Sequence, residues 1–327
     1  MKILYLGHPQ TYELYKAGKA PSHWLYGAVE MEKAGHEVIW EWTRPGKMWH
    51  DILMVWQHKP NVVFIPTMNV NNHLMLLLLT ALRFQRKPVV AYMHHEPSKK
   101  DGLKGTIFRL LYSGVRHFFF LSEKTMEETI YSGIVPSKKC SVPGWGPDMD
   151  FYSKVEKTEG DYFVSTGKEN RDFDVLVETF KHTGAPLKIM TARQHAGSDY
   201  TWLEERCKDI PNIEVILTEN SGNIYPKMLS LMAGAKALVC PLKKDKLNYC
   251  VGLSTIADAE GLGKPLIITR NPYHSEERLK QFNVVETVED WVEAIKYVKQ
   301  SQKTDYSMQN CWKNMKEQLG GITKEIK

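Results

Sequence analysis

The sequence lacks most of the features that mark a secreted, disulfide-bonded or membrane-spanning protein. Its five cysteines are odd in number and widely spaced, with no C-x-x-C pair, which argues for free thiols and against a disulfide framework or a zinc site. The longest largely apolar run, Leu74 to Leu82, has nine residues, whereas a membrane-spanning helix needs about 20. The opening MKILYLGHP carries only a short apolar stretch, so we expect no signal peptide. Together these absences predict a cytoplasmic protein.

Several catalytic signatures are also missing. No G-x-G-x-x-G follows the first apolar stretch, where only Gly7-His8-Pro9 stands, and this disfavours a dinucleotide-binding oxidoreductase. No carboxylate pair has a recognisable glycoside hydrolase arrangement. No carboxylate–histidine cluster has the spacing of metal ligands. We therefore expect neither a metal nor a resident cofactor.

The net charge of +5 is confined to the first half of the chain. Residues 1–150 hold 18 Lys and Arg against 13 Asp and Glu, while residues 151–327 hold 25 of each sign. Eight basic and two acidic residues lie between Arg83 and Arg116. This segment is either a solvated face or a patch for an anionic membrane surface. It lacks the interleaved pattern of a nucleic-acid reader, so we expect no nucleic-acid partner.

Short apolar runs alternate with helical apolar spacing along the whole chain, which predicts parallel sheets covered by helices on both faces. A Pro/Gly cluster followed by charges at 141–157 divides the chain into domains 1–150 and 151–327. The second domain ends in a helical tail that we expect to pack back on the first. Two doubly wound α/β domains place a cleft between two sets of strand carboxyl ends, where ligands bind. The expected strands are Lys2–Leu6, His36–Trp42, Asn61–Pro66, Pro88–Met93, Arg116–Leu121, Asp161–Ser165, Leu187–Thr191, Ile213–Leu217, Ala237–Pro241 and Pro265–Thr269. The expected helices are Trp24–Ala34, Lys47–Gln57, His73–Gln85, Thr106–Tyr112, Glu123–Tyr131, Phe173–Phe180, Tyr200–Lys208, Ile224–Met232, Thr255–Leu262, Trp291–Lys299 and Tyr306–Leu319.

The segment Ala237–Thr269 carries the sharpest functional pattern. A buried strand and a polar loop lead to Gly252-Leu253-Ser254-Thr255, which opens a helix. A turn of small residues at a helix N-terminus presents free backbone N–H groups and so favours a phosphate. Asp258 lies one turn further on the same helix face, where its carboxylate could accept hydrogen bonds from ribose hydroxyls. The alternative is that Ser254 or Thr255 only caps the helix and that Asp258 only favours its N-terminal end.

The same segment resembles the donor-site signature of the GT4 family of retaining glycosyltransferases, which have the GT-B fold of two Rossmann-like domains. The run Asp258-Ala259-Glu260-Gly261-Leu262-Gly263-Lys264-Pro265 is similar to the second half of that signature, with Asp258 in place of the ribose-binding glutamate. A first glutamate is expected at position 250, where this chain has Cys250. That departure leaves open an inactive homologue.

Three further segments resemble the family. Phe163 to Phe173 is similar to the first strand and loop of the donor domain, and the resemblance implies that Lys168 and Arg171 reach the diphosphate. Val142 to Phe151 resembles the linker between the domains, and Pro21 to Val38 resembles the first helix and second strand. Of the pair that ends the strand Pro88–Met93, either His94 or His95 would face the donor sugar; the alternative is a hydrogen bond to a loop. The donor-binding residues implied by the resemblance are Gly7, Gly167, Thr191, Arg193, Gly252, Leu253, Ser254, Thr255 and Asp258.

The resemblance implies transfer of a sugar from a nucleoside-diphosphate donor to a glycan or lipid-linked acceptor with retention of configuration. Lys168, Arg171 and the amides of 252–255 would stabilise the leaving diphosphate, and replacing either side chain should slow transfer with little effect on folding. No protein base is then needed. Alternatives are an inverting transferase with Glu13, Glu96 or a histidine as base, and a subunit that binds the donor without turnover. Because apolar residues flank Arg109 (Ile107, Phe108, Leu110 and Leu111), residues 83–116 are the candidate contact with an anionic membrane.

Overall fold

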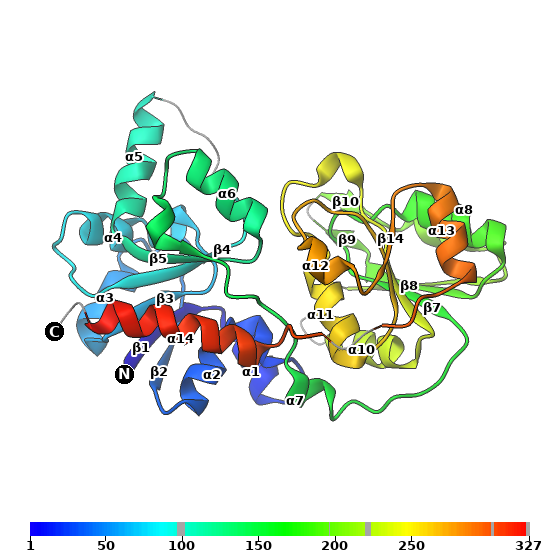
Figure 1. The fold of residues 1–327 in the computed structure, drawn as a ribbon, viewed down its shortest axis with the longest axis horizontal. Coiled ribbons are helices and arrows are strands. Elements are labelled where there is room, and N and C mark those ends of the chain that lie inside the picture. The colour runs from blue at the N-terminus through cyan, green and yellow to red at the C-terminus, as the bar shows by residue number, and fades with distance from the viewer. Residues whose placement is uncertain (97–101, 196, 220–223, 302–303, 325–327) are drawn as a thin grey trace. The chain divides into compact units, whose positions relative to one another are not determined.

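The computed structural model describes residues 1–327 except 97–101, 196, 220–223, 302–303 and 325–327, and the backbone alone of 322–324. The chain divides into two compact units (Figure 1). Unit 1 comprises Met1–Lys16, Ser22–Gly146 and Tyr306–Lys327, and unit 2 comprises Ala17–Pro21 and Pro147–Asp305. Two basic residues of the candidate membrane segment, Lys99 and Lys100, lie outside the described residues.

Unit 1 is built on one parallel sheet of six strands in the order β2-β1-β3-β4-β5-β6. Ile3 of the first strand lies opposite Val38 on one side and Val62 on the other, which fixes the register. The inner strands are buried along almost their whole length, because helices cover both faces, as parallel sheets require. The strands are β1 (Lys2–Gly7), β2 (Glu37–Trp42), β3 (Val62–Ile65), β4 (Val89–Met93), β5 (Val115–Phe120) and β6 (Cys140–Ser141).

The helices of unit 1 form a layer on each face of this sheet. One layer contributes Ile52, Leu76 and Leu111 to a core with residues of β1, β3, β4 and β5. On the other face α14 contacts α2, and the hydroxyl of Tyr92 lies 3.4 Å from the sulfur atoms of both Cys311 and Met315. The helices are α1 (Pro9–Lys16), η1 (Ser22–Leu25), α2 (Ala28–Lys33), α3 (His50–His58), α4 (Val70–Ala81), α5 (Gly102–Ser113), α6 (Glu123–Tyr131), η2 (Ser137–Lys139) and α14 (Met308–Lys324).

The continuous helix expected over Trp24–Ala34 is interrupted. Tyr26 and Gly27 have φ angles of 51° and 92°, so the chain turns in the left-handed region between η1 and α2. An α-helix cannot pass through that conformation. The expectation of a single helix was therefore wrong, and the turn places Tyr26 beside the carboxyl ends of the strands.

Unit 2 repeats this architecture with a parallel sheet in the order β11-β8-β7-β12-β13-β14. Helices α8, α9 and α13 supply Phe180, Leu203 and Trp291 to the core on one face, while α10 and α11 contact β7 and β12. The strands are β7 (Phe163–Thr166), β8 (Leu187–Ala192), β11 (Ile213–Thr218), β12 (Ala237–Cys240), β13 (Leu266–Thr269) and β14 (Asn283–Val285), with a short antiparallel pair β9 (Gln194–His195) and β10 (Ser198–Asp199). The helices are α7 (Met149–Tyr152), α8 (Phe173–Thr183), α9 (Trp202–Cys207), α10 (Tyr225–Gly234), η3 (Lys244–Lys246), α11 (Leu253–Leu262), α12 (Glu276–Leu279) and α13 (Val288–Lys296).

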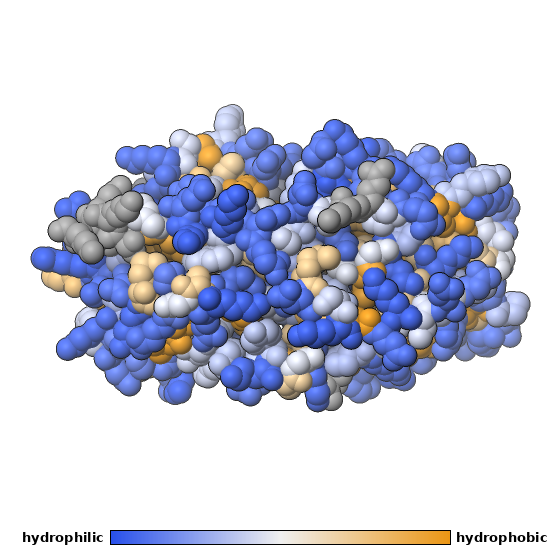
Figure 2. All heavy atoms as spheres, turned by 60° about the horizontal axis from the view of Figure 1, so that its bottom comes forward, coloured by the Kyte–Doolittle hydropathy of each residue, from blue (hydrophilic) through white to orange (hydrophobic). Residues whose placement is uncertain are grey.

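The face drawn in Figure 2 is mostly hydrophilic, with hydrophobic residues in small separate groups. None of the helices within the described residues combines the length and the apolar character needed to cross a membrane.

Candidate functional site

The carboxyl edge of the unit 2 sheet brings the loop after β7 next to the start of α11. Strand β7 lies between β8 and β12, so the connections run in opposite directions from it and create the switch point at which α/β sheets bind ligands. Gly252 precedes α11 with φ 91° and ψ −8°, and no side chain caps the helix. The amide of Leu253 bonds to the carbonyl of Cys250, whereas those of Ser254 and Thr255 belong to the first turn, which has no partners within the helix.

Arg171 is almost fully buried and bridges this loop to α11. Its Nε donates to the carbonyl of Thr166 (3.3 Å), its Nη1 to the carbonyl of Glu169 (2.9 Å) and its Nη2 to Oγ1 of Thr255 (3.1 Å). Gly167, with φ 98°, gives it room, because a Cβ there would lie 2.6 Å from Nη2. These bonds use three of the five guanidinium N–H groups. Arg171 therefore fixes the geometry of the phosphate-site candidate and keeps N–H groups for a ligand.

Lys168 lies in the same loop and is half-buried. Its carbonyl accepts a hydrogen bond of 2.7 Å from the hydroxyl of Tyr200, and its charge contributes to lowering the pKa of His195, after burial. On the next residue, the Glu169 carboxylate acts on Tyr249: burial raises the pKa of the Tyr249 hydroxyl, and the negative charge of Glu169 raises it further. The loop is thus held at several points.

Cys250 occupies the position where the resemblance expects a glutamate. The thiol is buried, and burial raises its pKa to about 12, so it brings no negative charge to the site near neutral pH. Beside it, His274 lies against the carbonyls of Cys250 and Val251, yet neither ring nitrogen makes a hydrogen bond of good geometry with the described residues. Burial, reinforced by Arg278 and Arg171, lowers the pKa of His274 to about 4. Cys250 and His274 are therefore both neutral near pH 7, and the charged side chain bonded to the first turn of α11 is Arg171.

Asp258 is buried on α11, and its Oδ1 accepts two hydrogen bonds. The hydroxyls of Tyr152 and Tyr225 each donate at 2.6 Å, and these two oxygens lie 2.9 Å apart. Burial raises the pKa of Asp258 to about 6, against the lowering effect of the tyrosines. Asp258 thus ties α7 and α10 to α11, and its ribose-binding role stays a prediction.

Thr191 lies near the end of β8, and Arg193 is the first residue after this strand. Thr191 is buried, and its Oγ1 finds no hydrogen-bond partner among the described residues, which leaves a hydroxyl at the carboxyl edge to bond with a ligand. Arg193 is partly exposed and forms ion pairs with Glu204 (3.5 Å) and Glu219 (3.4 Å). Its side chain is thus engaged by carboxylates of unit 2.

The carboxyl edge of unit 1 has a small pocket at its own switch point, between β1 and β3. The cavity has a volume of about 220 Å³ and is lined by Tyr5, His8, Thr11, Trp24, Tyr26, Pro66 and Thr67. Gly7 lies beside it, where a Cβ would lie 2.1 Å from the Tyr5 ring. A tyrosine with positive φ is a conformational outlier of the kind that clusters at ligand sites. Tyr26 therefore joins the candidate residues of this edge.

The two histidines after β4 have different surroundings. Nε2 of His94 lies 3.1 Å from the carbonyl of Pro66, so this nitrogen carries the proton, and the ring packs 5.0 Å from that of Tyr26. Burial lowers the pKa of His94 to about 4. His95 is exposed. His94 is therefore a neutral imidazole next to the unit 1 pocket, and the hydrogen bond to a loop, considered above as the alternative, is present.

Sequence reasoning missed the residues that brace these edges. Tyr152 and Tyr225 stand far from Asp258 in the chain and carry no local signal. Asn271 is fully buried, and its Nδ2 donates at 3.0 Å to the carbonyls of Tyr249 and Val251. The polar run Asn271 to His274 directly after strand β13 was the available signal, since it follows a strand at the ligand edge.

Within the described ranges, no group of three His, Cys, Asp or Glu side chains could hold a metal ion. The expectation that the protein works without a metal stays a prediction.

Comparison with known proteins supports the fold. The sequence matches no protein-family model and no curated protein. Among solved structures, a putative UDP-N-acetylglucosamine 2-epimerase from Listeria monocytogenes aligns with a TM-score of 0.62 at 12% identity, covering 99% of this chain and 97% of that one. HepE of Anabaena, in complex with UDP-glucose, also gives 0.62 at 12% identity, covering 98% and 100%. AviGT4, a glycosyltransferase involved in avilamycin A biosynthesis, gives 0.59 at 12% identity, covering 98% and 96%. The chain therefore has the two-domain GT-B fold, as the sequence predicted; membership of the GT4 family stays a prediction.

Proposed function

We propose that the protein binds a UDP-sugar through unit 2 and transfers the sugar to an acceptor. The observation that carries this proposal is the uncapped start of α11, where the first-turn amides of Ser254 and Thr255 lie next to the Arg171 guanidinium at the sheet's switch point. A helix N-terminus of this kind attracts a diphosphate. Solved structures of similar fold hold UDP-glucose and UDP-N-acetylglucosamine, and this makes uridine our choice of base.

The chemistry follows from where charge develops. Breaking the bond between the sugar and the diphosphate leaves negative charge on the leaving oxygen and positive charge on the sugar. Arg171, Lys168 and the α11 amides would stabilise the leaving group, and prepositioned donors of this kind are typically the largest contribution to catalysis. The leaving phosphate itself would take the acceptor's proton, so that configuration is retained without a protein base. Asp258 would bind the ribose.

A second candidate is a reaction at the donor without transfer, or binding of the donor alone. The neutral thiol of Cys250 at the position of the expected glutamate favours it, because one contact with the donor would be missing. Proteins of similar fold include UDP-N-acetylglucosamine 2-epimerases. This candidate shares the diphosphate site and differs in the product.

Two measurements on the full chain test these proposals. Calorimetric titration with UDP and then with UDP-glucose and UDP-N-acetylglucosamine should give saturable binding that weakens in Lys168→Ala. Chromatography of the nucleotide sugar after incubation then distinguishes three outcomes: release of UDP, as the sugar passes to water or to an added acceptor; epimerisation; and an unchanged donor, which means simple binding. No binding of any uridine nucleotide would refute the donor proposal, whereas binding with an epimerised product would refute transfer.

On the acceptor side we propose an acceptor at an anionic membrane surface, contacted through α5. Leu103, Ile107 and Leu110 lie on one face of this helix and are 77%, 44% and 41% exposed, and Lys104 and Arg109 are exposed among them. Apolar side chains beside cations suit a helix that lies in the membrane interface. Phe108 and Leu111, by contrast, pack against the core of unit 1, so they do not belong to the proposed contact.

A further inference from the structure

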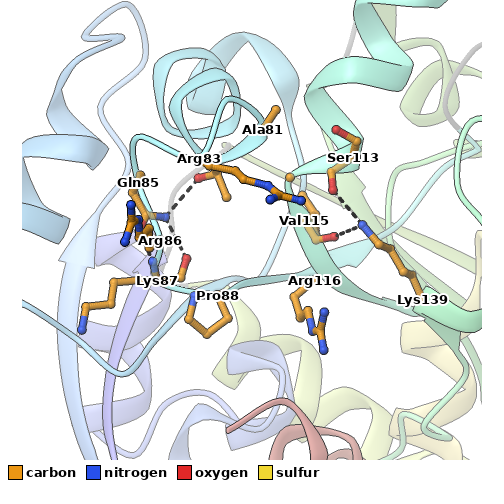
Figure 3. A pocket seen from close by; sticks show the side chains of 12 residues that line it. Ala81, Arg83, Gln85, Arg86, Lys87, Pro88, Ser113, Val115, Arg116 and Lys139 are labelled. Carbon is orange, nitrogen blue, oxygen red and sulfur yellow. Dashed lines mark hydrogen bonds between the residues drawn. The ribbon is translucent and has the colours of Figure 1, made fainter. Parts of the chain in front are cut away.

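A large basic pocket lies at the opposite edge of the unit 1 sheet from the candidate ligand edge. Its residues come from the end of α4, the turn into β4, the end of α5, the start of β5 and the residue before β6 (Figure 3). The cavity has a volume of about 730 Å³ and is lined by Thr80, Ala81, Arg83, Gln85, Arg86, Lys87, Pro88, Ser113, Gly114, Val115, Arg116 and Lys139. It lies at the amino ends of three strands, and the fold's expected ligand sites are at the carboxyl ends. The ligand sites expected for a GT-B fold therefore do not include this pocket.

The charge of the pocket is strongly one-sided. Arg83, Arg86, Lys87, Arg116 and Lys139 contribute five cations, and none of the described lining residues is acidic. The C-terminal ends of α4 and α5 add roughly one negative charge between them, so the lining residues together keep a net positive charge. The pKa of Lys139 is lowered, mainly by burial and further by the positive charges of Arg116 and Lys138.

The wall of the pocket is rigidly built. The buried amide of Gln85 donates through Nε2 to Oγ1 of Thr80 (3.0 Å) and to the carbonyl of Lys87 (2.8 Å), and its Oε1 accepts from the amide of Lys87. Opposite, Nζ of Lys139 donates to the carbonyls of Ser113 (2.7 Å) and Val115 (2.8 Å) (Figure 3). These hydrogen bonds hold the backbone that carries the cations in place, which reduces the conformational entropy lost when a ligand binds.

Arg83 occupies an unusual place in this wall. It follows the end of α4 with φ 63°, at the position where helices are normally closed by glycine. An arginine is strained there, and residues kept in such conformations cluster at ligand sites. Neither Arg83 nor its neighbours Arg86 and Lys87 forms an ion pair with a carboxylate in the part of the chain that the structure describes.

We propose that this pocket is a second anion site, which binds a ligand carrying a diphosphate or phosphomonoester group. Guanidinium groups bind phosphate oxygens in pairs, and the volume exceeds that of a single phosphate. The ligand is either a soluble metabolite or the headgroup of a membrane lipid, and the chemistry recognised is the same. The site shares no residue with the donor site of unit 2, so it does not depend on the proposed function.

Counting bound inorganic pyrophosphate tests the site. Equilibrium dialysis compares the full-length protein with the variant Arg83→Ser/Lys87→Ser/Arg116→Ser; Lys139 is kept because it holds two carbonyls. A matched control removes three exposed cations elsewhere in unit 1, Lys16→Ser/Arg44→Ser/Lys47→Ser. The pocket variant should bind one equivalent fewer than the wild type and the control, or bind it at least tenfold more weakly. Equal stoichiometry and affinity in all three proteins would overturn the proposal, whether or not the donor site also binds pyrophosphate.

The variant Arg83→Gly separates a binding role from a structural one. Glycine relieves the left-handed strain, so the melting temperature should rise by about 2 °C, while pyrophosphate affinity should fall. A higher melting temperature with unchanged pyrophosphate affinity would show that Arg83 takes no part in binding, and this would contradict the proposed anion site.

Vesicle flotation then identifies the source of the phosphate. Neutral phosphatidylcholine vesicles are supplemented with phosphatidic acid, which carries a phosphomonoester, or with phosphatidylserine at equal surface charge. A preference for phosphatidic acid that the pocket variant loses indicates a lipid headgroup. Pyrophosphate binding without such a preference indicates a soluble ligand. If pyrophosphate does not bind and the vesicles are not distinguished, the pocket binds no phosphate and the proposal fails.

Discussion

The carboxyl group of Asp258 is held where ionisation is costly. Its pKa of about 6, against the ordinary value of 3.8 for an aspartate, means that the folded state binds this proton more tightly than the unfolded state. The free energy of unfolding therefore falls as the pH rises from about 4 to about 6, by about 3 kcal/mol in all, and is level above that range. A buried carboxyl that lowers stability near neutral pH is a frequent mark of a functional group.

We predict that Asp258→Asn is more stable than the wild type above pH 6 and nearly equal to it at pH 4. The amide oxygen can still accept from Tyr152 and Tyr225, but it never ionises. At the same time its donor affinity should fall at least tenfold, because an amide binds ribose hydroxyls more weakly than a carboxylate. Urea unfolding at several pH values and titration with UDP measure the two effects. Unchanged affinity would leave Asp258 with a purely structural role.

Replacing Lys168 and replacing Arg171 should affect the stability of the folded protein differently. Both replacements with alanine are expected to slow transfer by ~10²-fold, the typical cost of one electrostatic contact to the leaving group. Lys168→Ala should unfold like the wild type. Arg171→Ala should lose about 3 kcal/mol, because it breaks two buried hydrogen bonds and a third that is partly buried. From the sequence we predicted little effect on folding for both variants. The structure changes this expectation for Arg171, because a loop motif shows neither its burial nor its hydrogen-bond partners. Full activity in Lys168→Ala with a native melting curve would place the diphosphate elsewhere.

At the level of the secondary structure elements, the start of α11 depends on the conformation of one glycine. Gly252 and Gly263, before and after the helix, have φ angles of 91° and 65°. Alanine at either position should cost ~1–3 kcal/mol. Only Gly252→Ala should also weaken UDP binding, because its Cβ would lie 3.3 Å from Sγ of Cys240 and shift the first-turn amides. Calorimetry on both variants measures this, and equal affinities would remove the helix start from the site.

Helix α5 should determine membrane binding. The variant Leu103→Ser/Ile107→Ser/Leu110→Ser should bind anionic vesicles at least tenfold more weakly, since three exposed apolar side chains no longer insert. The control Val288→Ser removes a half-exposed apolar residue of unit 2 and should bind like the wild type. Vesicle co-sedimentation at low and high salt gives the comparison. Equal binding of the variant and the wild type would refute the contact through α5.

The sequence predicted elements with a clear local pattern better than the contacts between elements. Strand β3 was predicted to within one residue at each end, and helix α6 was predicted at its observed bounds. Both rest on local signals, namely apolar periodicity and the capping residue Ser122. Helix α1 and strand β14 were missed. The sequence Pro9–Lys16 has no buried residue and hence no apolar stripe. Likewise, the pairing of Asp258 with two tyrosines, 106 and 33 residues away, arises from tertiary packing that no local pattern contains.

For the whole molecule, the donor proposal assigns the nucleotide to one unit of the two. UDP at about 100 times its dissociation constant would stabilise the folded state that binds it by about 2.7 kcal/mol. Amide groups exchange with solvent only when the local structure opens, so the bound nucleotide should slow exchange where it contacts the backbone.

We therefore predict that UDP slows hydrogen exchange in residues 163–171 and 250–258 of unit 2, and leaves strands β1 to β5 of unit 1 unchanged. The amides of Ser254 and Thr255 would donate to the diphosphate, and the loop after β7 is tied to them by Arg171. Mass spectrometry of peptic fragments with and without UDP makes the measurement, and Lys168→Ala at the same UDP concentration should show weaker protection. Protection confined to the pocket at the carboxyl edge of unit 1, around His8 and Thr67, would instead assign the nucleotide to unit 1 and refute the donor site proposed at α11.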